Sequence, residues 1–236
     1  MGIRAARDVD AQVARMVEFL RSFEYPIEKS KTQPFVTISR EYGCEAFEVA
    51  QALVEGLDKR RDAGPPWQVY DRNIIEIVAH DSQISERIIE SMAPAHRAAF
   101  DEFQRSMVLK MLSRDETCIR TARVIKSIAW HGRSVIIGRG GYLLCSDMEG
   151  GFHVQIVAPR DWRMEQTALR HNFGSETEAY NYLDMMDRAR RQFFCSCYGC
   201  EAGDRQDFDL VIDNSRSSPR EMVEMIISGM TQRGLI

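Results

Sequence analysis

Short apolar runs alternate with longer stretches of helical periodicity along most of this chain. The apolar runs predict five strands, at residues 35–39, 67–70, 134–138, 153–157 and 209–213. Helical patterns predict helices at residues 45–57, 73–131 (interrupted at Pro94) and 219–233. Strands this short and continuously apolar are typical of a parallel sheet that helices cover on both faces. We therefore expect a doubly wound α/β fold around a parallel five-stranded sheet.

The first 33 residues have a pattern of their own. Apolar side chains recur at helical spacing between residues 3 and 24, with charged residues between them, which predicts an amphipathic helix. The segment from Pro26 to Pro34 indicates a linker. We expect residues 1–33 to form an N-terminal helix and linker, and residues 34–236 to form one α/β domain. The helix either packs on its own domain or serves for homodimerisation or docking.

Composition narrows the classes of partner. The chain has 236 residues, a net charge of −4 and a sequence pI near 5.8, so no global basic field favours nucleic acid or an anionic membrane. No run approaches the roughly 20 apolar residues of a membrane span, and the N-terminus lacks an apolar signal core. We expect a cytoplasmic protein.

The cysteines form no regular framework. They occupy positions 44, 118, 145, 195, 197 and 200. In a reducing cytosol free thiols are expected. The segment Cys195-Ser-Cys-Tyr-Gly-Cys200 invites a metal interpretation, but no fourth ligand follows at finger-like spacing. We therefore expect no metal site there, and a metal or redox protein built on Cys195, Cys197 and Cys200 is the least favoured interpretation.

The first strand leads through a glycine turn into a helix, an arrangement that can bind phosphate. Backbone N–H groups and the positive end of the helix dipole point at one place. The residues of this predicted donor loop are Ser39, Arg40, Gly43, Cys44 and Glu45. The usual lysine of such a loop is absent. The carboxylate of Glu45 opposes a bound anion, because two like charges about 4 Å apart cost roughly 4 kcal/mol at an effective dielectric near 20.

Six segments, in order, carry a resemblance to a known family. They are Ile38-Ser-Arg-Glu-Tyr-Gly43, Val69-Tyr-Asp-Arg-Asn-Ile-Ile75, Val135-Ile-Ile-Gly-Arg-Gly-Gly-Tyr142, His153-Val-Gln-Ile-Val-Ala-Pro-Arg-Asp-Trp-Arg163, Asp187-Arg-Ala-Arg-Arg191 and Phe208-Asp-Leu-Val-Ile-Asp-Asn-Ser215. From about residue 35 to 230 the chain resembles the cytidylate-kinase-like family of P-loop nucleoside monophosphate kinases. The resemblance implies a P-loop NTPase-type fold, with an acceptor-binding helical insertion at 73–131 and a lid at about 160–208.

The resemblance also implies an activity. That activity is transfer of the γ-phosphoryl group of ATP, with Mg²⁺, to a nucleoside monophosphate, with CMP or dCMP as the first expectation. By similarity, the acceptor-binding residues are Asp71, Arg72, Arg139 and Gly140, and the catalytic residues are Arg188 and Arg191 of the lid.

Each of these motifs also has a plain structural interpretation. Arg139 is then an exposed arginine in a glycine turn, and Asp71 is a helix cap. Arg188 and Arg191 are then part of a solvated helix face.

The donor loop departs from the family pattern. Relatives carry a series such as Gly-Ser-Gly-Gly-Arg where this chain has Gly43-Cys-Glu-Ala-Phe47. In one interpretation the protein is a divergent kinase in which Arg40, Arg139, Arg188 and Arg191 supply the missing positive charge. In the other it is a catalytically impaired module that senses a nucleotide or binds a protein.

Overall fold

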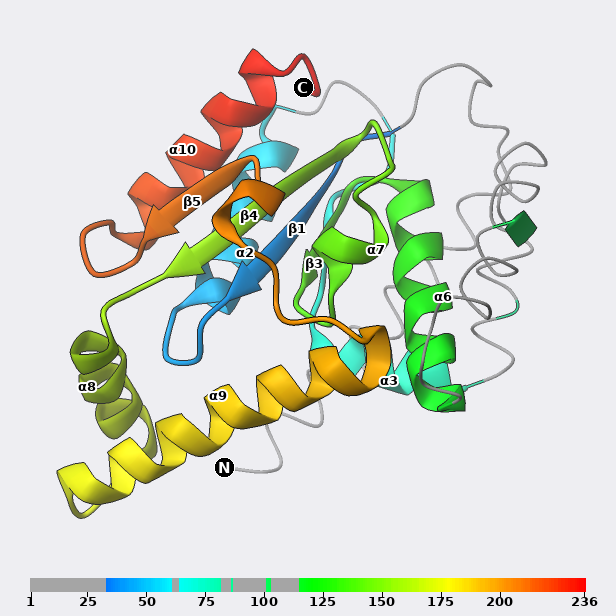
Figure 1. The fold of residues 1–236 in the computed structure, drawn as a ribbon. Coiled ribbons are helices and arrows are strands. Elements are labelled where there is room, and N and C mark those ends of the chain that lie inside the picture. Colours follow the sequence, from blue (N-terminus) through cyan, green and yellow to red (C-terminus); the bar gives the residue numbers. More distant parts are fainter. Residues whose placement is uncertain (1–32, 61–63, 82–85, 87–100, 103–114) are drawn as a thin grey trace.

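A parallel five-stranded sheet forms the centre of the computed structural model, which describes residues 33–60, 64–81, 86, 101–102 and 115–236 (Figure 1). The strands are β1 (Phe35–Arg40), β2 (Gln68–Tyr70), β3 (Ser134–Ile137), β4 (Gly151–Val157) and β5 (Leu210–Asp213). Their order in the sheet is β2-β3-β1-β4-β5, and every pairing is parallel. The predicted fold class is confirmed.

Helices fill most of the remaining described chain. They are α2 (Ala46–Asp58), α3 (Arg72–His80), α6 (Glu116–His131), α7 (Gly141–Leu144), α8 (Arg160–His171), α9 (Glu176–Tyr198) and α10 (Pro219–Gln232), with a 3₁₀ turn at Arg205–Asp207. The predicted region 73–131 is described only as α3, α6 and the isolated positions between them, and the rest of it lies outside the described residues. The predicted N-terminal helix also lies outside them. The four-residue helix α7 was not predicted, because the glycines before it indicated only a turn.

Alternating side chains of β1 place helices on both faces of the sheet. Val36 and Ile38 pack in a core cluster with α2 and α10. Phe35 belongs to a second cluster that α3, α6 and α7 contribute to. Side chains of a strand alternate between the two faces of a sheet, so this division follows directly from the sequence. The central strand β1 is thereby buried from both sides.

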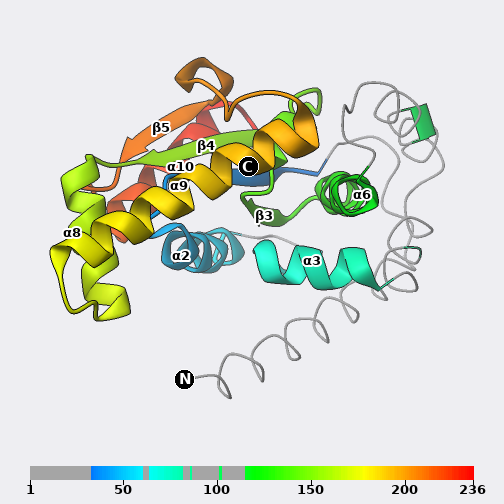
Figure 2. The same cartoon turned by 60° about the horizontal axis from the view of Figure 1, so that its bottom comes forward.

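The helices α8 and α9 lie beyond the carboxyl ends of the strands and pack against each other (Figures 1 and 2). Ser175 begins α9 by accepting a hydrogen bond from the N–H of Glu178. The helix then extends for 23 residues to Tyr198 and brings its last turns next to α6 and α7. The carboxyl edge of the sheet is where open α/β sheets bind ligands. The pair α8 and α9 therefore covers the edge where a site is expected.

A disulfide joins the end of α9 to α6, between Cys118 and Cys197, whose Cα atoms are 5.5 Å apart. The prediction that all the cysteines are free thiols is therefore wrong for these two. They are 79 positions apart in the sequence, so their spacing gave no indication that α6 and α9 meet. The other four cysteines are free.

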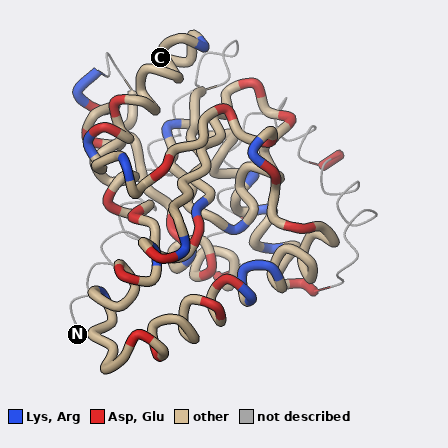
Figure 3. Tube along the Cα trace, turned by 60° about the vertical axis from the view of Figure 1, so that its left-hand side comes forward, with Lys and Arg blue, Asp and Glu red and all other residues tan. Residues whose placement is uncertain are grey.

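Basic and acidic residues alternate along the described chain instead of separating onto different faces (Figure 3). No helix among the described residues combines the length and the apolar character that crossing a bilayer requires. Four arginines do gather at one place, the cavity described next.

Candidate functional site

A cavity of about 230 Å³ lies at the carboxyl edge of the sheet, between the ends of β1 and β3, the start of α7 and the inner face of α9. Four arginines from four parts of the chain line it: Arg40, Arg72, Arg139 and Arg190. The other lining residues are Thr37, Ile38, Ser39, Tyr42, Gly138, Gly140, Gly141, Tyr142, Met186, Ala189, Phe193 and Phe194. Four converging guanidinium groups give this cavity the donors and the charge that an anion requires.

Arg40 enters the cavity across the backbone of Gly138. A Cβ atom at Gly138 would lie 2.1 Å from a terminal nitrogen of Arg40, so only glycine leaves room for the guanidinium. Burial lowers the pKa of Arg40, and the nearby charge of Arg190 lowers it further. The arginines thus repel one another in a poorly hydrated space, and a bound anion would relieve that repulsion.

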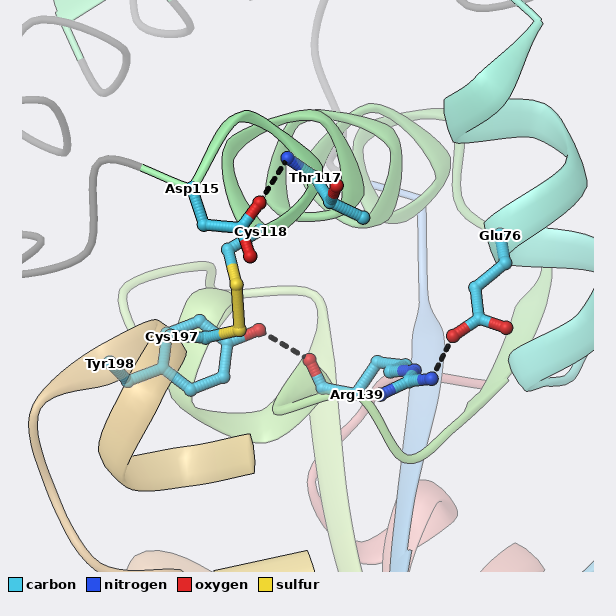
Figure 4. Close-up of a disulfide and its surroundings, with 7 residues drawn as sticks. All are labelled: Glu76, Asp115, Thr117, Cys118, Arg139, Cys197 and Tyr198. Atoms are coloured by element: carbon cyan, nitrogen blue, oxygen red, sulfur yellow. Dashed lines mark hydrogen bonds and ion pairs between the residues drawn. A yellow bond between two sulfur atoms is a disulfide. The ribbon is translucent and has the colours of Figure 1, made fainter. Parts of the chain in front are cut away.

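Arg139 has an unusual backbone conformation, with φ of +50° in the left-handed region. The hydroxyl of Tyr198 donates a hydrogen bond of 2.6 Å to the carbonyl oxygen of Arg139 and fixes this loop from α9 (Figure 4). The guanidinium of Arg139 lies 4.5 Å from the ring centre of Phe193 and forms an ion pair with Glu76. Burial, followed by the charge of Arg72, lowers the pKa of Arg139 to about 10, so the side chain is still charged at neutral pH. The interpretation of Arg139 as an exposed arginine does not hold, because its side chain is only 13% exposed.

Arg190 is the arginine that α9 contributes to the cavity. Its terminal nitrogen donates a hydrogen bond of 3.1 Å to the hydroxyl of Ser39. The two lid arginines predicted to be catalytic do not line the cavity: Arg188 is 70% exposed and pairs with Asp184, and Arg191 is exposed. In this conformation the structure therefore places Arg190 at the candidate site, and neither Arg188 nor Arg191.

The predicted acceptor residues lie together around the same cavity. Arg72 and Gly140 line it. Asp71 accepts a hydrogen bond of 3.0 Å from the N–H of Ile74 and caps α3, which confirms its structural interpretation. By holding the start of α3, Asp71 places Arg72 at the cavity.

The predicted donor loop divides into two parts. Ser39 and Arg40 line the arginine cavity, whereas Gly43, Cys44 and Glu45 lie outside it. Burial raises the pKa of the Cys44 thiol to about 12, so this side chain is neutral and unsuited to act as a nucleophile at neutral pH.

The protein's own groups occupy the turn at the start of α2. The N–H of Glu45 donates a hydrogen bond of 2.9 Å to the side-chain oxygen of Asn214, and its carboxylate pairs with Arg170 at 3.1 Å. A Cβ atom at Gly43 would lie 2.9 Å from both the Cβ and the carbonyl oxygen of Arg163, so α8 packs directly on the turn. The Asn214 side chain thus takes one of the N–H groups that a phosphate at this turn would need, and the Glu45 carboxylate takes the neighbouring cation of Arg170.

The buried Arg163 holds this closed arrangement together. It donates hydrogen bonds to the carbonyl oxygens of Tyr42 (3.1 Å) and Ala158 (3.2 Å), and it pairs with Asp187 of α9 at 3.0 Å. These partners engage its Nε and one of its terminal nitrogens, so Arg163 cannot move to replace the missing lysine of the loop without breaking these contacts.

These observations decide how well a nucleoside triphosphate with Mg²⁺ fits. The turn of the donor loop offers no unpaired cation, since Arg163 and Arg170 both pair with carboxylates, and the N–H groups of Cys44 and Glu45 already have acceptors. The residues present therefore do not fit a triphosphate in this conformation. Among the described residues, no group of three or more histidine, cysteine, aspartate and glutamate side chains could hold a metal ion. The arginine cavity, by contrast, fits a single phosphate group.

Periodicity could have identified Arg190 from the sequence. The buried positions of α9 include Leu183, Phe194 and Cys197. Arg190 falls on that same face because it lies two helical turns from both Leu183 and Cys197, a spacing that neither Arg188 nor Arg191 has. The resemblance to a lid motif indicated arginines in this segment, but only the apolar pattern distinguishes the one that faces inward. Glu76, the partner of Arg139, had no comparable signal.

The cysteine arrangement gives a first testable prediction. Alkylation of the native protein at neutral pH, followed by mass spectrometry, should label the exposed Cys195 first. Cys44 and Cys145 should be labelled only after unfolding, because burial raises the pKa of each thiol to about 12. Without reductant, the peptides of Cys118 and Cys197 should be recovered as a linked pair. Rapid labelling of Cys118 in the native, unreduced protein would contradict the disulfide.

Comparisons with known proteins support the fold. A crystal structure of an uncharacterized protein from Eubacterium ventriosum ATCC 27560 aligns with a TM-score of 0.64 at 22% identity, over 85% of this chain and 99% of that one. The crystal structure of TT1252 from Thermus thermophilus aligns with a TM-score of 0.40 at 13% identity, over 86% of this chain and 98% of the other. The first of these shows a shared fold.

Two sequence comparisons complete the picture. The uronate isomerase of Corynebacterium glutamicum is 26% identical over 93 residues, which are 39% of this chain but only 18% of that protein's length. The sequence model of the cytidylate kinase-like family matches residues 35–216 of this chain. That segment contains the whole sheet and all four cavity arginines, and it is more than half of the chain. The protein therefore belongs to the cytidylate kinase-like family.

Proposed function

We propose that this protein binds the phosphate group of a nucleoside monophosphate in its arginine cavity, with CMP or dCMP as the first candidates. The observation that carries the proposal is the convergence of Arg40, Arg72, Arg139 and Arg190 on one cavity. A guanidinium group presents its N–H donors as a planar fork that matches phosphate oxygens. Four such groups offer more positive charge and more donors than a carboxylate ligand would require, which favours a phosphate.

The size of the cavity supports a single nucleotide. Its volume of about 230 Å³ is below the roughly 300–1,000 Å³ of ordinary ligand pockets, which supports a ligand no larger than a phosphate with part of a nucleoside. Tyr142 and Phe194 line the same space and offer aromatic surface to a sugar or base. The choice of a cytidine nucleotide comes from the family and not from a base contact.

The closed donor loop favours binding over catalysis. Because Asn214 and Arg170 engage Glu45, we propose that the protein in this conformation binds a monophosphate without transferring a phosphoryl group. The second candidate function is ATP-dependent phosphoryl transfer, with Mg²⁺ held by the triphosphate. It is favoured by Arg190, which reaches from α9 to Ser39 at the strand end that leads into the loop.

The proposed partners are accordingly nucleotides, and the proposed location is the cytoplasm, where free nucleotides occur. Homodimerisation through the N-terminal helix is a separate proposal, and cross-linking of the full chain with and without residues 1–33 tests it.

Paired arginine variants on α9 test the proposed function. CMP should raise the melting temperature of the wild type, because a ligand that binds only the native state stabilises it. Arg190→Ala should weaken CMP binding by about 1.5–3 kcal/mol, the value of a charged hydrogen bond. Arg188→Ala and Arg191→Ala should bind CMP as the wild type does, because neither side chain lines the cavity. A larger loss in Arg188→Ala than in Arg190→Ala would assign the site to a different lid conformation.

A further inference from the structure

Glu76 of α3 does not itself line the arginine cavity, but it binds two of the arginines that do. Its carboxylate forms an ion pair with a terminal nitrogen of Arg139 (Figure 4). It also accepts hydrogen bonds of 3.2 and 3.4 Å from the Nε of Arg72. One carboxylate thus bridges a guanidinium from α3 and a guanidinium from the loop after β3. A phosphate bound by the same two arginines would need the same donors.

The ion pair between Glu76 and Arg139 leaves one N–H donor of the guanidinium without a partner. Arg139 is nearly buried, and its Nε has no hydrogen-bond partner. Glu76 is 32% exposed, so its side chain can leave toward solvent without unfolding α3. A buried donor without a partner is costly, which means that the carboxylate does not use all that the guanidinium offers.

Charge balance points in the same direction. Arg40, Arg139 and Arg190 all have lowered pKa values, with burial as the largest cause in each case. Four arginines and no carboxylate line the cavity. From outside the lining, Glu76 pairs with Arg72 and Arg139, while Asp71 acts on Arg40, and Glu41 and Asp187 act on Arg190. A phosphomonoester, which carries nearly two negative charges at neutral pH, would bring more negative charge to Arg72 and Arg139 than the carboxylate of Glu76 does.

We propose that Glu76 is an exchangeable counterion that occupies the phosphate position on Arg139 and Arg72, and that a ligand binds by displacing it. This inference rests on the proposed function and deepens it. It makes Glu76 a specificity-determining residue, because an incoming group must carry more negative charge than the carboxylate it replaces. A phosphomonoester meets that condition, whereas a cyclic phosphodiester with one negative charge does not.

The variant Glu76→Gln tests the exchange. Glutamine keeps the size of the side chain and removes the charge that competes with the ligand. In titration calorimetry at neutral pH, Glu76→Gln should bind CMP at least tenfold more tightly than the wild type does. Its affinity for inorganic phosphate should also be higher than that of the wild type. Cytidine, which has no phosphate, should bind both proteins equally. The wild type should bind cyclic CMP more weakly than CMP.

A matched control comes from α10. Arg220 and Glu224 form an ion pair with the same four-residue spacing and a distance of 3.1 Å, on a helix that does not line the cavity. Glu224→Gln should leave every affinity unchanged. Thermal unfolding of both variants without ligand shows whether they are folded.

The outcomes separate this inference from the proposed function. If the wild type binds CMP and Glu76→Gln binds it equally or more weakly, Glu76 only orients the arginines, so the exchange is wrong while the proposed function stands. An equal gain for cytidine would also overturn the exchange, because the effect would not depend on phosphate. If neither protein binds CMP or phosphate, the proposed function fails and the exchange fails with it.

Discussion

Arg139→Ala should abolish measurable stabilisation of the protein by CMP. The substitution removes the guanidinium that projects into the cavity from the loop after β3, and with it a bidentate partner for the phosphate. The expected loss of about 1.5–3 kcal/mol corresponds to a roughly 10- to 150-fold weaker affinity. Titration calorimetry and thermal shift with CMP measure it.

A graded variant shows whether the geometry or the charge of Arg139 matters. Arg139→Lys keeps the positive charge but loses the planar fork, so its CMP affinity should lie between those of the wild type and Arg139→Ala. Arg191→Ala removes an exposed arginine from α9 and serves as the control. Equal CMP binding by the wild type and Arg139→Ala would remove Arg139 from the site.

Opening the donor loop should create affinity for ATP. The double variant Glu45→Gly, Phe47→Arg removes the carboxylate that pairs with Arg170 and places a cation on the exposed position of Phe47. Arg170 then loses its partner and becomes available to a phosphate beside the start of α2. The variant should bind ATP·Mg²⁺ at least tenfold more tightly than the wild type, a change of about 1.4 kcal/mol. Its CMP affinity should hardly change, because neither residue lines the arginine cavity.

A neighbouring carboxylate provides the control for the loop. Glu48→Gln removes a negative charge from the same first turn of α2 while leaving the pair between Glu45 and Arg170 in place, so it should not gain ATP affinity. Micromolar ATP binding and CMP phosphorylation by the wild type would contradict the closed loop and favour the divergent kinase. A folded double variant that still does not bind ATP would show that residues outside this turn also prevent ATP binding.

The sheet could be predicted because its signals are local. The apolar run at β1 is short, continuous and followed by a glycine turn, and its alternating side chains divide between the two cores. The start of α10 was equally clear, since Ser218 and Glu221 form a capping box with Pro219 as the first helical residue. Each of these features depends on a few neighbouring residues.

The details of the site depend on contacts between distant parts of the chain. The hydrogen bond between Asn214 and the start of α2 joins residues 169 positions apart, and no sequence pattern predicts this contact. The disulfide partner of Cys118 and the carboxylate that faces Arg139 were hidden for the same reason. The sequence therefore indicated the arginines and a phosphate loop that Glu45 obstructs, but not the contacts with Asn214 and Arg170 that hold this loop closed.

The most direct test of the account is a titration of the wild-type protein with CMP, cytidine and ATP·Mg²⁺ under identical conditions. The account predicts that CMP binds one site per chain at least tenfold more tightly than cytidine, because its phosphate meets the four arginines, and that ATP binds more weakly than CMP. Equal affinities for CMP and cytidine, or tighter binding of ATP than of CMP, would contradict it.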